Sequence, residues 1–509
     1  MYVKYIFTIQ SIRKEIYQNM KRAFSLALAI MLVLLSASCG GAESAGSDTT
    51  AAPVDTTAAE TVPTDGLPDT DMDGFSLNIL HHDDTWLTWA KTQLVAPEEN
   101  GELINDAIYK RKIYIEDRFN CVLNISEMDQ TTKVFKNLVT SGDTTYDLIM
   151  QYGLHVLGNI DYLADFNNLP HIQLDEEYWN PNATSVFAVG DKQLAVAGNY
   201  TLSYLSGATT FLFNKKIADN LKLTENLYQS VYDGKWTTDK FYETVVQGIS
   251  DLNGDSKIEA ENDCIGITGQ AKAYWNSLII GAGFRYVDFN EDHEPYFNLK
   301  GNERMLEFLQ KIVERESTEP YIYPVTNDML SSSAIQNATP NADFKSGNSF
   351  FSQAMIFKIE TEMRDMETDF GILPPPKYDE KQETYKPYAN IGEILTLPRT
   401  FDMSRAENVG MLLEAMAFYS QQHIVPAYKE TVLQVKLTRD EDSPKMLDYI
   451  FSDIVFDYGT VVWESAITGP IIKNYLMPRS STLVSAVEGI AAKMDADIEK
   501  LLESAVNVP

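Results

Sequence analysis

T-F-L-F-N-K-K, residues 210–216, joins a strand signal to a helix signal. Phe211 to Phe213 form a short apolar run that favours a β-strand, and Asn214 ends it with a turn-prone side chain. Lys215 then opens a segment of helical character. A strand that gives way directly to a helix is therefore predicted here.

Two further signals follow within residues 236–266. The run W-T-T-D-K-F, residues 236–241, contains Thr237 and Thr238, either of which can cap a helix that starts at Asp239. The acidic run D-L-N-G-D-S-K-I-E-A-E-N-D, residues 251–263, then places oxygen-bearing side chains at alternate positions. Together with the preceding strand, these signals predict a large binding lobe.

The N-terminal region carries a bacterial secretion signal. Lys21 and Arg22 precede an apolar run over residues 23–35, and small residues follow up to Cys39. Met20 is the expected initiator, with residues 1–19 an upstream extension, because the charged region of a signal normally lies directly against its apolar run.

The sequence L-S-A-S-C, which ends at Cys39, resembles a lipobox and predicts cleavage and acylation at that cysteine. The alternative is a transmembrane anchor, but the apolar run is shorter than the roughly 20 residues that span a bilayer. Residues 40–72 are rich in Ala, Thr, Ser, Gly, Pro and Asp, so they are expected to form a flexible tether.

Residues 73–509 exceed what one hydrophobic core usually supports, so two lobes are expected. The formal net charge of −32 opposes nucleic acid and anionic lipid headgroups as ligands, and a neutral ligand fits better. Besides Cys39, only Cys121 and Cys264 remain, and their spacing does not say whether they pair. Apolar strand residues flank both, which favours two separately buried thiols.

Polar and aromatic residues follow the predicted strands of the first lobe. The alternating run at residues 75–80 leads into H-H-D-D-T-W, which includes Asp84 and Trp86, and the buried strand at 146–150 leads to Tyr152. A helix over 102–119 and a strand over 122–125 complete a β-α-β unit. Because ligands collect beyond the carboxyl ends of strands in α/β sheets, these residues are candidate ligand contacts.

Each of these candidates has an alternative interpretation. The two His and two Asp at residues 81–84 would also suit a metal, although no further motif with metal-ligand spacing supports one. Tyr152 would equally suit the core. Tyr200, in the segment expected to cross between the lobes, is the favoured sugar-binding aromatic there, because sugars present apolar CH faces beside their hydroxyls.

The order of these features resembles the extracellular solute-binding proteins of carbohydrate ABC importers, over roughly residues 75–509. Phe213-Asn214-Lys215, preceded by Leu194-Ala195-Val196, is similar to the crossing-strand pattern of that family, although Ala197 stands where its proline is usual. The segments F-K-S-G-N-S-F-F, residues 344–351, and D-F-G-I-L-P-P-P, residues 369–376, are similar to later strands of the family.

The resemblance implies an α/β, two-lobed, periplasmic-binding-protein-like fold of type II, each lobe a sheet flanked by helices, with hinge crossovers. The first lobe is expected to comprise residues 73–200 and 366–405, and the second 201–365 and 406–509. It also implies that Trp275 starts a helix facing the cleft and that Asn390 contacts ligand from the hinge side. Helices over 304–313 and from Ala406 onward are expected to pack the second lobe.

The implied function is capture of a saccharide and its delivery to the permease subunits of an ABC importer. The implied protein is a monomer without catalytic residues, held by its lipid anchor on the outer face of the cell membrane. A secreted polysaccharide-degrading lipoprotein is the alternative, but the chain has no G-x-S-x-G, H-E-x-x-H or phosphate-loop motif. The repeated all-β pattern of an adhesion module is also missing.

Residues 251–263 are interpreted as a structural calcium loop. Asp251, Asn253 and Asp255 would supply side-chain oxygens and Lys257 a backbone carbonyl. The resemblance implies Asp263 as the closing ligand, through a one-residue bulge. The loop departs from the EF-hand at two positions, with Ser256 in place of Gly and Asn262 in place of Glu, and an Asx-rich turn without metal is the alternative.

Overall fold

Two β-sheets organise the part of the chain that the computed structural model describes. The described residues are 64–82, 93–128, 131–259, 261–326, 329, 342–389, 392–434 and 441–509. The secretion signal, Cys39 and the candidate ligand residues Asp84, Trp86 and Asn390 lie outside them. Residues 64–509 form one unit, which contains both sheets.

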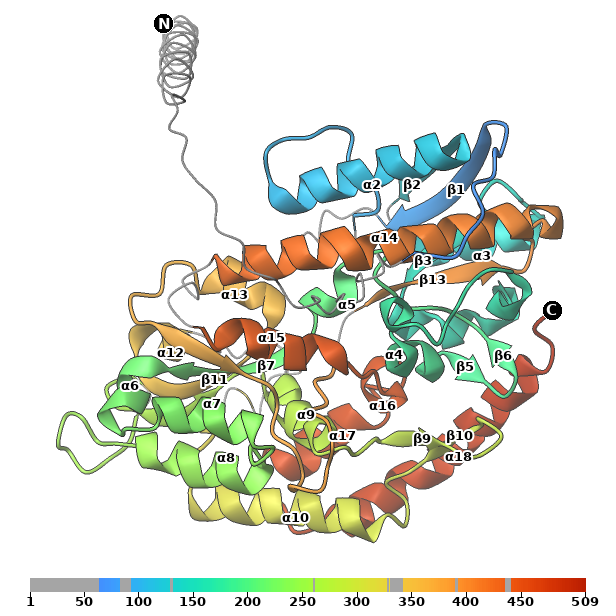
Figure 1. The fold of residues 1–509 in the computed structure, drawn as a ribbon. Helices are drawn as coiled ribbons and strands as arrows, with labels where there is room; N and C mark the ends of the chain where they lie inside the picture. The colour runs from blue at the N-terminus through green and yellow to red at the C-terminus, as the bar shows by residue number, and fades with distance from the viewer. Residues whose placement is uncertain are drawn as a thin grey trace, which may run out of the picture. The chain divides into compact units, whose positions relative to one another are not determined.

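The first sheet has five strands in the order β2-β1-β3-β13-β4 (Figure 1). Its strands are β1 (Phe75–His82), β2 (Cys121–Met128), β3 (Leu148–Tyr152), β4 (Leu163–Ala164) and β13 (Glu393–Pro398). β1 runs parallel to both β2 and β3, whereas β13 runs antiparallel to β3 and β4. The predicted β-α-β unit is confirmed, with α2 (Leu103–Phe119) between β1 and β2.

The second sheet has four strands in the order β12-β7-β11-β8. Its strands are β7 (Thr209–Asn214), β8 (Ile265–Thr268), β11 (Ser349–Met355) and β12 (Phe370–Leu373), and every residue of β7 is buried. The predicted change from strand to helix is confirmed, because β7 ends at Asn214 and α6 (Lys215–Asn220) begins directly after it. The Asn214 side chain caps α6 by accepting a hydrogen bond from the Ile217 amide at 3.2 Å.

The segment 366–405, which the sequence assigned to the first lobe, contributes one strand to each sheet. β12 pairs antiparallel with β7, so it lies in the second sheet, and only β13 joins the first. Residues 342–346 form the short helix α12 (Ala342–Ser346) where a strand from Phe344 was expected. The exact boundaries of the two lobes stay a prediction.

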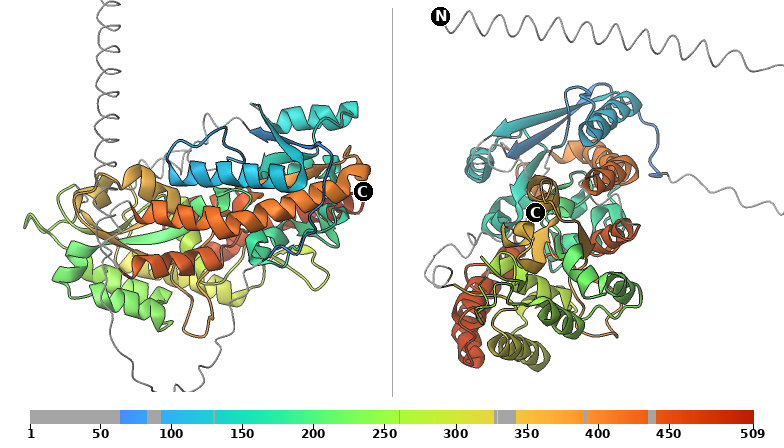
Figure 2. Two further views of the ribbon diagram at one scale, coloured as in Figure 1. Left: turned by 45° about the horizontal axis from the view of Figure 1, so that its top comes forward. Right: turned by 90° about the vertical axis from the view of Figure 1, so that its left-hand side faces the viewer.

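Helices cover both sheets (Figures 1 and 2). The long helix α14 (Ala406–Leu433) lies alongside α2, which belongs to the first half of the chain, rather than serving the second lobe alone. No helix among the described residues is long and apolar enough to cross a membrane. The other α-helices are α3 (Thr131–Ser141), α4 (Pro181–Val186), α5 (Ser203–Ser206), α7 (Thr224–Tyr232), α8 (Thr238–Val245), α9 (Ala271–Gly281), α10 (Glu303–Thr318), α13 (Ile356–Glu362), α15 (Ser443–Ser452), α16 (Tyr458–Val461), α17 (Thr468–Ile471) and α18 (Leu483–Ala505).

A buried arginine ties α2 to two distant segments and to α14. Arg111 donates from one terminal nitrogen to the Tyr200 carbonyl at 2.7 Å and to the Ser420 hydroxyl at 2.6 Å. Its other terminal nitrogen donates to the Leu94 carbonyl. Because burial disfavours its charge, the pKa of Arg111 is lowered to about 10. The guanidinium thus joins three segments that are distant in the sequence.

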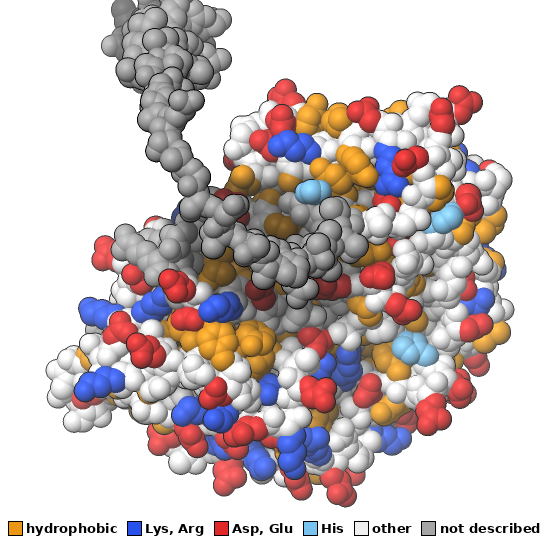
Figure 3. All heavy atoms as spheres, in the orientation of Figure 1, with side chains coloured by type: hydrophobic (Ala, Val, Ile, Leu, Met, Phe, Trp, Pro, Cys, Tyr) orange, Lys and Arg blue, Asp and Glu red, His pale blue; other side chains and the backbone are white. Residues whose placement is uncertain are grey.

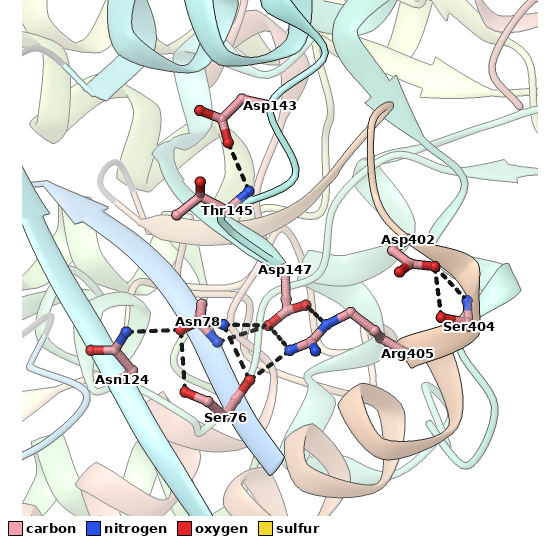
Figure 4. Close-up of polar contacts among 9 residues, drawn as sticks. All are labelled: Ser76, Asn78, Asn124, Asp143, Thr145, Asp147, Asp402, Ser404 and Arg405. Carbon is pink, nitrogen blue, oxygen red and sulfur yellow. Dashed lines mark hydrogen bonds and ion pairs between the residues drawn. The ribbon is translucent and has the colours of Figure 1, made fainter.

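Arg405, at the start of α14, forms hydrogen bonds with a residue of the first sheet and with the residue that precedes β3 (Figure 4). Its guanidinium donates to the Asp147 carboxylate, once at 2.9 Å, and to the Ser76 carbonyl at 2.6 Å. Asp147 also accepts the Asn78 amide at 2.8 Å. Hydrogen bonding to Asp147 raises the pKa of Arg405. The network joins β1 to the residues just before β3.

The predicted flexible tether ends earlier than residue 72. Arg118 of α2 donates to the Asp65 and Asp69 carboxylates and to the Leu67 carbonyl. Met72 is buried, and its backbone amide donates to the Phe119 carbonyl at 2.8 Å. Residues from Thr64 onward therefore belong to the folded body. The composition of residues 64–72 does not indicate that they are folded, because their contacts are with α2 and not with neighbours in sequence.

Two buried carboxylates gather aromatic side chains around them. Glu414 of α14 accepts hydrogen bonds from the Tyr178 hydroxyl and, at 2.7 Å, from the Trp179 indole nitrogen. It also accepts the Gln173 backbone and side-chain nitrogens at 3.1 and 3.0 Å. Glu414 is fully buried, and these four donors satisfy it.

Glu316 of α10 plays the corresponding part beside the second sheet. It accepts the hydroxyls of Tyr242 and Tyr274, each at 2.9 Å, and the Trp275 indole nitrogen at 3.3 Å. Burial raises the pKa of Glu316 to about 7, against the lowering effects of nearby Arg479 and of the three aromatic donors. The fold therefore favours the protonated carboxyl up to neutral pH.

The two described cysteines are separate. Cys121 and Cys264 are both buried and free, which confirms the expectation of single burial. Burial raises the pKa of the Cys121 thiol to about 11 and that of Cys264 to about 12, so both remain protonated and unreactive near neutral pH.

On the face shown in Figure 3, acidic and basic side chains are interspersed. Exposed pairs of this kind include Lys300 with Asp495 at 2.7 Å and Lys493 with Asp497. Each such pair contributes little stability by itself. Mixing opposite charges at short range nevertheless reduces the self-repulsion that a net charge of −32 would otherwise produce.

Glu316→Gln is predicted to change how stability depends on pH. A pKa raised from 4.5 to about 7 means that the stabilisation is fully present below pH 4.5 and is lost as the pH rises through 7, by roughly 3 kcal/mol at most. Urea unfolding at pH 5 and pH 8 should therefore show a larger loss of stability in the wild type than in the variant.

The quantity to compare is the loss of stability between pH 5 and pH 8 in the wild type and in the variant. This comparison is needed because other buried groups, such as Asp457, whose pKa is raised to about 6, titrate in the same range. Glu314→Gln, on the exposed face of the same helix, is the matched control and should behave as wild type. Parallel pH profiles for wild type and Glu316→Gln would contradict the prediction.

Candidate functional site

The end of β3 and the start of β13 meet as a cross-strand pair. Tyr152 lies directly opposite Glu393 in the register of these antiparallel strands, so both side chains point to the same face of the sheet. Tyr152 is partly exposed, whereas Glu393 is buried. The Gly153 amide also donates to the Gly392 carbonyl at 3.0 Å, which continues the pairing just beyond the strands.

His81, from β1, holds the Glu393 carboxylate. His81 Nε2 lies 2.8 Å from Glu393 Oε2, and the two side chains are 1% and 0% exposed. The Glu393 backbone amide donates to the Ser203 hydroxyl at 2.8 Å. The other carboxylate oxygen, Oε1, is buried and has no hydrogen-bond partner among the described residues. A buried acceptor left without a donor is costly, so this oxygen is a candidate ligand contact.

A second carboxylate approaches Tyr152 from the C-terminal part of the chain. Glu464, which follows α16, lies 2.7 Å from the Lys272 ammonium group of α9, and its side chain is 36% exposed. The pKa of Tyr152 is raised, first by burial and then by the carboxylates of Glu393 and Glu464. Both carboxylates therefore act on the same phenolic oxygen.

Asn276 and Tyr388 extend the cluster. The Asn276 side-chain oxygen accepts the Tyr286 hydroxyl at 3.0 Å, but its amide nitrogen is buried without a partner in the described part of the chain. The Tyr388 hydroxyl is likewise buried there without a hydrogen bond of normal geometry. Its pKa is raised by burial, lowered by hydrogen bonding to the Asn276 side chain and raised by the charge of Glu464. Asn276 and Tyr388 therefore lie within reach of each other, although their geometry falls short of a normal hydrogen bond.

We refer to the following residues as the polar cluster: His81, Tyr152, Lys272, Asn276, Tyr388, Glu393 and Glu464. They come from β1, β3 and β13 of the first sheet and from α9 and the segments before β13 and after α16. Within the described structure the cluster contains a buried acceptor without a partner, Glu393 Oε1, and two buried groups that can donate, Asn276 Nδ2 and the Tyr388 hydroxyl. A ligand that both donates and accepts hydrogen bonds would satisfy them.

Trp463 adds an aromatic surface next to Glu464. Its ring is partly buried and makes an edge-to-face contact with Tyr458, with centroids 5.5 Å apart. Unlike the fully buried Trp179, Trp236 and Trp275, Trp463 is partly exposed, and it directly precedes Glu464 in the chain. This combination of apolar ring and polar neighbour suits a ligand with both CH and hydroxyl groups.

Of the predicted ligand residues, the structure places Tyr152 in the polar cluster. Tyr200 is buried, and its hydroxyl donates to the Val196 carbonyl at 2.8 Å and accepts the Leu395 amide at 3.0 Å. Trp275 is fully buried against Glu316. Neither Tyr200 nor Trp275 presents a ring face to an open surface.

Trp275 lies on the helix that also carries two residues of the polar cluster, but its own ring is buried. Lys272, one turn earlier in α9, and Asn276, the next residue, both belong to the polar cluster. From sequence an aromatic residue is the natural choice, because sugars stack on rings, and nothing near Lys272 in the chain distinguishes it. The carboxylate that turns Trp275 inward, Glu316, lies on another helix.

Several cluster residues were missed because nothing local marks them. Glu393 ends the run Y-A-N-I-G-E, close to the predicted contact Asn390. His81 follows the first predicted strand, close to the predicted contact Asp84. Glu464 and Lys272 have no such signal, since their pairing joins segments far apart in the chain.

The acidic loop closes on itself through backbone hydrogen bonds. Asp251 accepts the amides of Gly254 at 2.6 Å and Ser256 at 2.7 Å, and Asp255 accepts the Lys257 amide at 2.9 Å. Ser256 adopts a left-handed conformation with φ of 65°, as the glycine at the corresponding EF-hand position would. The loop therefore has a tight turn despite lacking that glycine.

Asp263 closes the loop through hydrogen bonds to backbone amides. Its two carboxylate oxygens accept the Leu252 and Glu259 amides, each at 2.9 Å, and the side chain is buried. These bonds lower the pKa of Asp263, first through Glu259. Among the described residues, no three His, Cys, Asp or Glu side chains lie close enough together to hold a metal ion.

Comparison with known proteins reveals the fold. No protein-family model matches the sequence, and no curated protein has significant sequence similarity to it. UspC from M. tuberculosis superposes with a TM-score of 0.54 at 12% identity, over 83% of this chain and 100% of that one. The cyclic α-maltosyl-1,6-maltose binding protein from Arthrobacter globiformis gives 0.51 at 14% identity, over 84% and 100%.

The chain thus has the α/β, two-lobed, periplasmic-binding-protein-like fold that the sequence predicted, with helices flanking each sheet. At these identities the likeness establishes the fold. The polar cluster, which takes residues from the first sheet and from α9 and the C-terminal segments, is then the candidate binding site within it.

Trp275→Ala is predicted to destabilise the protein. Removal of a fully buried indole that donates to Glu316 should cost about 3–5 kcal/mol, as for other large-to-small core changes. Urea unfolding measures this loss. Trp463→Ala, at a partly exposed ring, is the control and should cost much less. Unchanged stability in Trp275→Ala would restore Trp275 as a candidate ligand contact.

Proposed function

We propose that this protein is an extracytoplasmic substrate-binding protein that captures a saccharide between its two lobes and delivers it to an ABC importer. The observation that carries the proposal is the polar cluster, in which three buried polar atoms lack partners within the described structure. The fold supports the proposal, since a binding protein with this fold is named for a cyclic maltosyl-maltose ligand.

The chemistry of the cluster matches a saccharide. Each sugar hydroxyl donates one hydrogen bond and accepts others, so it can donate to Glu393 Oε1 and accept from Asn276 Nδ2. Trp463, a partly exposed residue, can offer its apolar ring to the CH face of a pyranose. Closure of the two lobes would bring the cluster residues of the first sheet and those of α9 and the C-terminal segments together around the ligand.

The protein is proposed to act without catalysis. The two carboxylates nearest Tyr152 are each held by a basic side chain, Glu393 by His81 at 2.8 Å and Glu464 by Lys272 at 2.7 Å. Such pairs position acceptors for a ligand. The alternative of a polysaccharide hydrolase predicts shortened sugar products during a binding assay, which chromatography would detect.

Tyr152→Phe is predicted to weaken saccharide binding about two- to tenfold, because it removes one hydroxyl that can bond to the ligand. A thermal-shift screen over mono- and oligosaccharides identifies a ligand, since binding to the folded state raises its stability. Calorimetry then compares wild type and variant. Tyr296→Phe, at an exposed tyrosine of β10 (Pro295–Phe297), should bind as wild type.

A screen in which no saccharide stabilises the protein would sink the proposed function. If a sugar binds and Tyr152→Phe binds it equally well, the function stands but Tyr152 does not contact the ligand.

The proposed location is the outer face of the cell membrane, through a lipid on Cys39. This proposal rests on the L-S-A-S-C run after an apolar segment. Cys39→Ala is predicted to release the protein into the medium or leave it unprocessed, which cell fractionation and mass measurement would show. Normal processing with continued membrane attachment would exclude the lipobox.

A structural calcium ion in the loop 251–263 remains a proposal. Its support is the alternate spacing of Asp251, Asn253 and Asp255 together with the left-handed turn at Ser256. A chelator is predicted to lower the melting temperature of the wild type, and Asp255→Ala should remove that dependence. Asp292→Ala, in a different exposed turn, should retain it. Melting that does not respond to chelator would favour a metal-free Asx turn.

A further inference from the structure

We propose that Glu393 sets the ligand class of the polar cluster: its Oε1 accepts a hydroxyl of a neutral saccharide, and its charge, together with that of Glu464, excludes anionic saccharides such as uronates. The inference rests on the proposed function, because it assigns the specificity of the same site.

Hydrogen bonds hold both the side chain and the backbone of Glu393. Its Oε2 is engaged by His81 at 2.8 Å, and its backbone amide donates to the Ser203 hydroxyl, also at 2.8 Å. Pairing with Tyr152 across the strands fixes the backbone. Oε1 is therefore a fixed acceptor, and no donor among the described residues reaches it. Once movement of the surrounding groups exposes this oxygen, it is already oriented to accept a hydroxyl.

The charge of the cluster opposes an anionic ligand. The cluster contains two carboxylates, and each described basic side chain within it is already engaged by one of them. Glu393, Glu464 and Lys272 together carry a formal charge of −1, and a protonated His81 would offset it. An anionic ligand would therefore add a second negative charge to a poorly hydrated site without meeting an available cation.

Tyr152 reports the sign of this field. Burial raises the pKa of Tyr152 most, and the carboxylates of Glu393 and Glu464 raise it further, because they oppose a negative charge at the phenolic oxygen. A uronate placed beside Tyr152 would experience the same repulsion. A hydroxyl-bearing ligand carries no charge and can donate to Glu393, so the site discriminates through both an attractive and a repulsive element.

Calorimetry with matched ligand pairs tests the proposal. The probes are maltose, cellobiose, mannobiose and galactobiose, and the C6-oxidised uronic-acid form of each. The wild type should bind its preferred neutral disaccharide at least about tenfold more tightly than the matching uronate. Glu393→Gln should weaken binding of the neutral disaccharide by about ten- to a hundredfold, because a charge-assisted acceptor is lost. It should therefore also narrow the ratio between the affinities for the neutral disaccharide and for its uronate.

Glu464→Gln tests the charge separately, at a partly exposed position where the fold tolerates substitution more readily. This variant should narrow the ratio of neutral-disaccharide to uronate affinity mainly by improving uronate binding. The reason is that the Lys272 ammonium group, no longer paired with the Glu464 carboxylate, becomes available to the uronate. Should Glu393→Gln fail to unfold cooperatively, the wild-type ratio and Glu464→Gln decide the question. Glu407→Gln is the matched control, because Glu407 also bonds a histidine, His171 at 2.6 Å, but at the surface.

Equal affinity of the wild type for a neutral disaccharide and its uronate would overturn the inference while leaving the proposed function intact. An unchanged ratio in both Glu393→Gln and Glu464→Gln would do the same. Failure of the wild type to bind any saccharide would overturn the proposed function, and this inference with it.

Discussion

The antiparallel pairing of β13 with β3 is the constraint on which the rest of the candidate site depends. It places Glu393 opposite Tyr152, and through the parallel pairing of β3 with β1 it brings His81 within 2.8 Å of Glu393. β13 comes from the last third of the chain, after β12 has joined the other sheet. The chain thus passes from one sheet to the other before the residue that carries the unsatisfied carboxylate oxygen.

Buried carboxylates organise the aromatic residues on both sides of this crossing. Glu414 receives Tyr178 and Trp179, and Glu316 receives Tyr242, Tyr274 and Trp275. In each case a glutamate on a long helix is satisfied by O–H and N–H donors whose rings fill the core around it. This arrangement explains why these large aromatic side chains are structural, and why Trp275 can be structural while Asn276 beside it belongs to the polar cluster.

Glu414 and Tyr200 differ from the polar cluster in how fully their hydrogen bonds are satisfied. Glu414 has four donors, and the Tyr200 hydroxyl has both a donor and an acceptor partner. Glu393, Asn276 and Tyr388 each retain a buried atom without a partner within the described structure. Because such atoms cost free energy when the fold leaves them unpaired, they favour the polar cluster as the candidate binding site.

The sequence by itself determined the local elements: the stop at Asn214, the cap at Thr237, which accepts the Lys240 amide at 3.2 Å, and the strand that delivers Tyr152. Their hydrogen bonds form between near neighbours, so residue type and spacing suffice to predict them. Tertiary structure alone decided that β12 joins the second sheet, that Trp275 turns inward and that Lys272 pairs with Glu464. Each of these depends on a partner distant in sequence, and burial by that partner determines whether a side chain supports the core or faces a ligand.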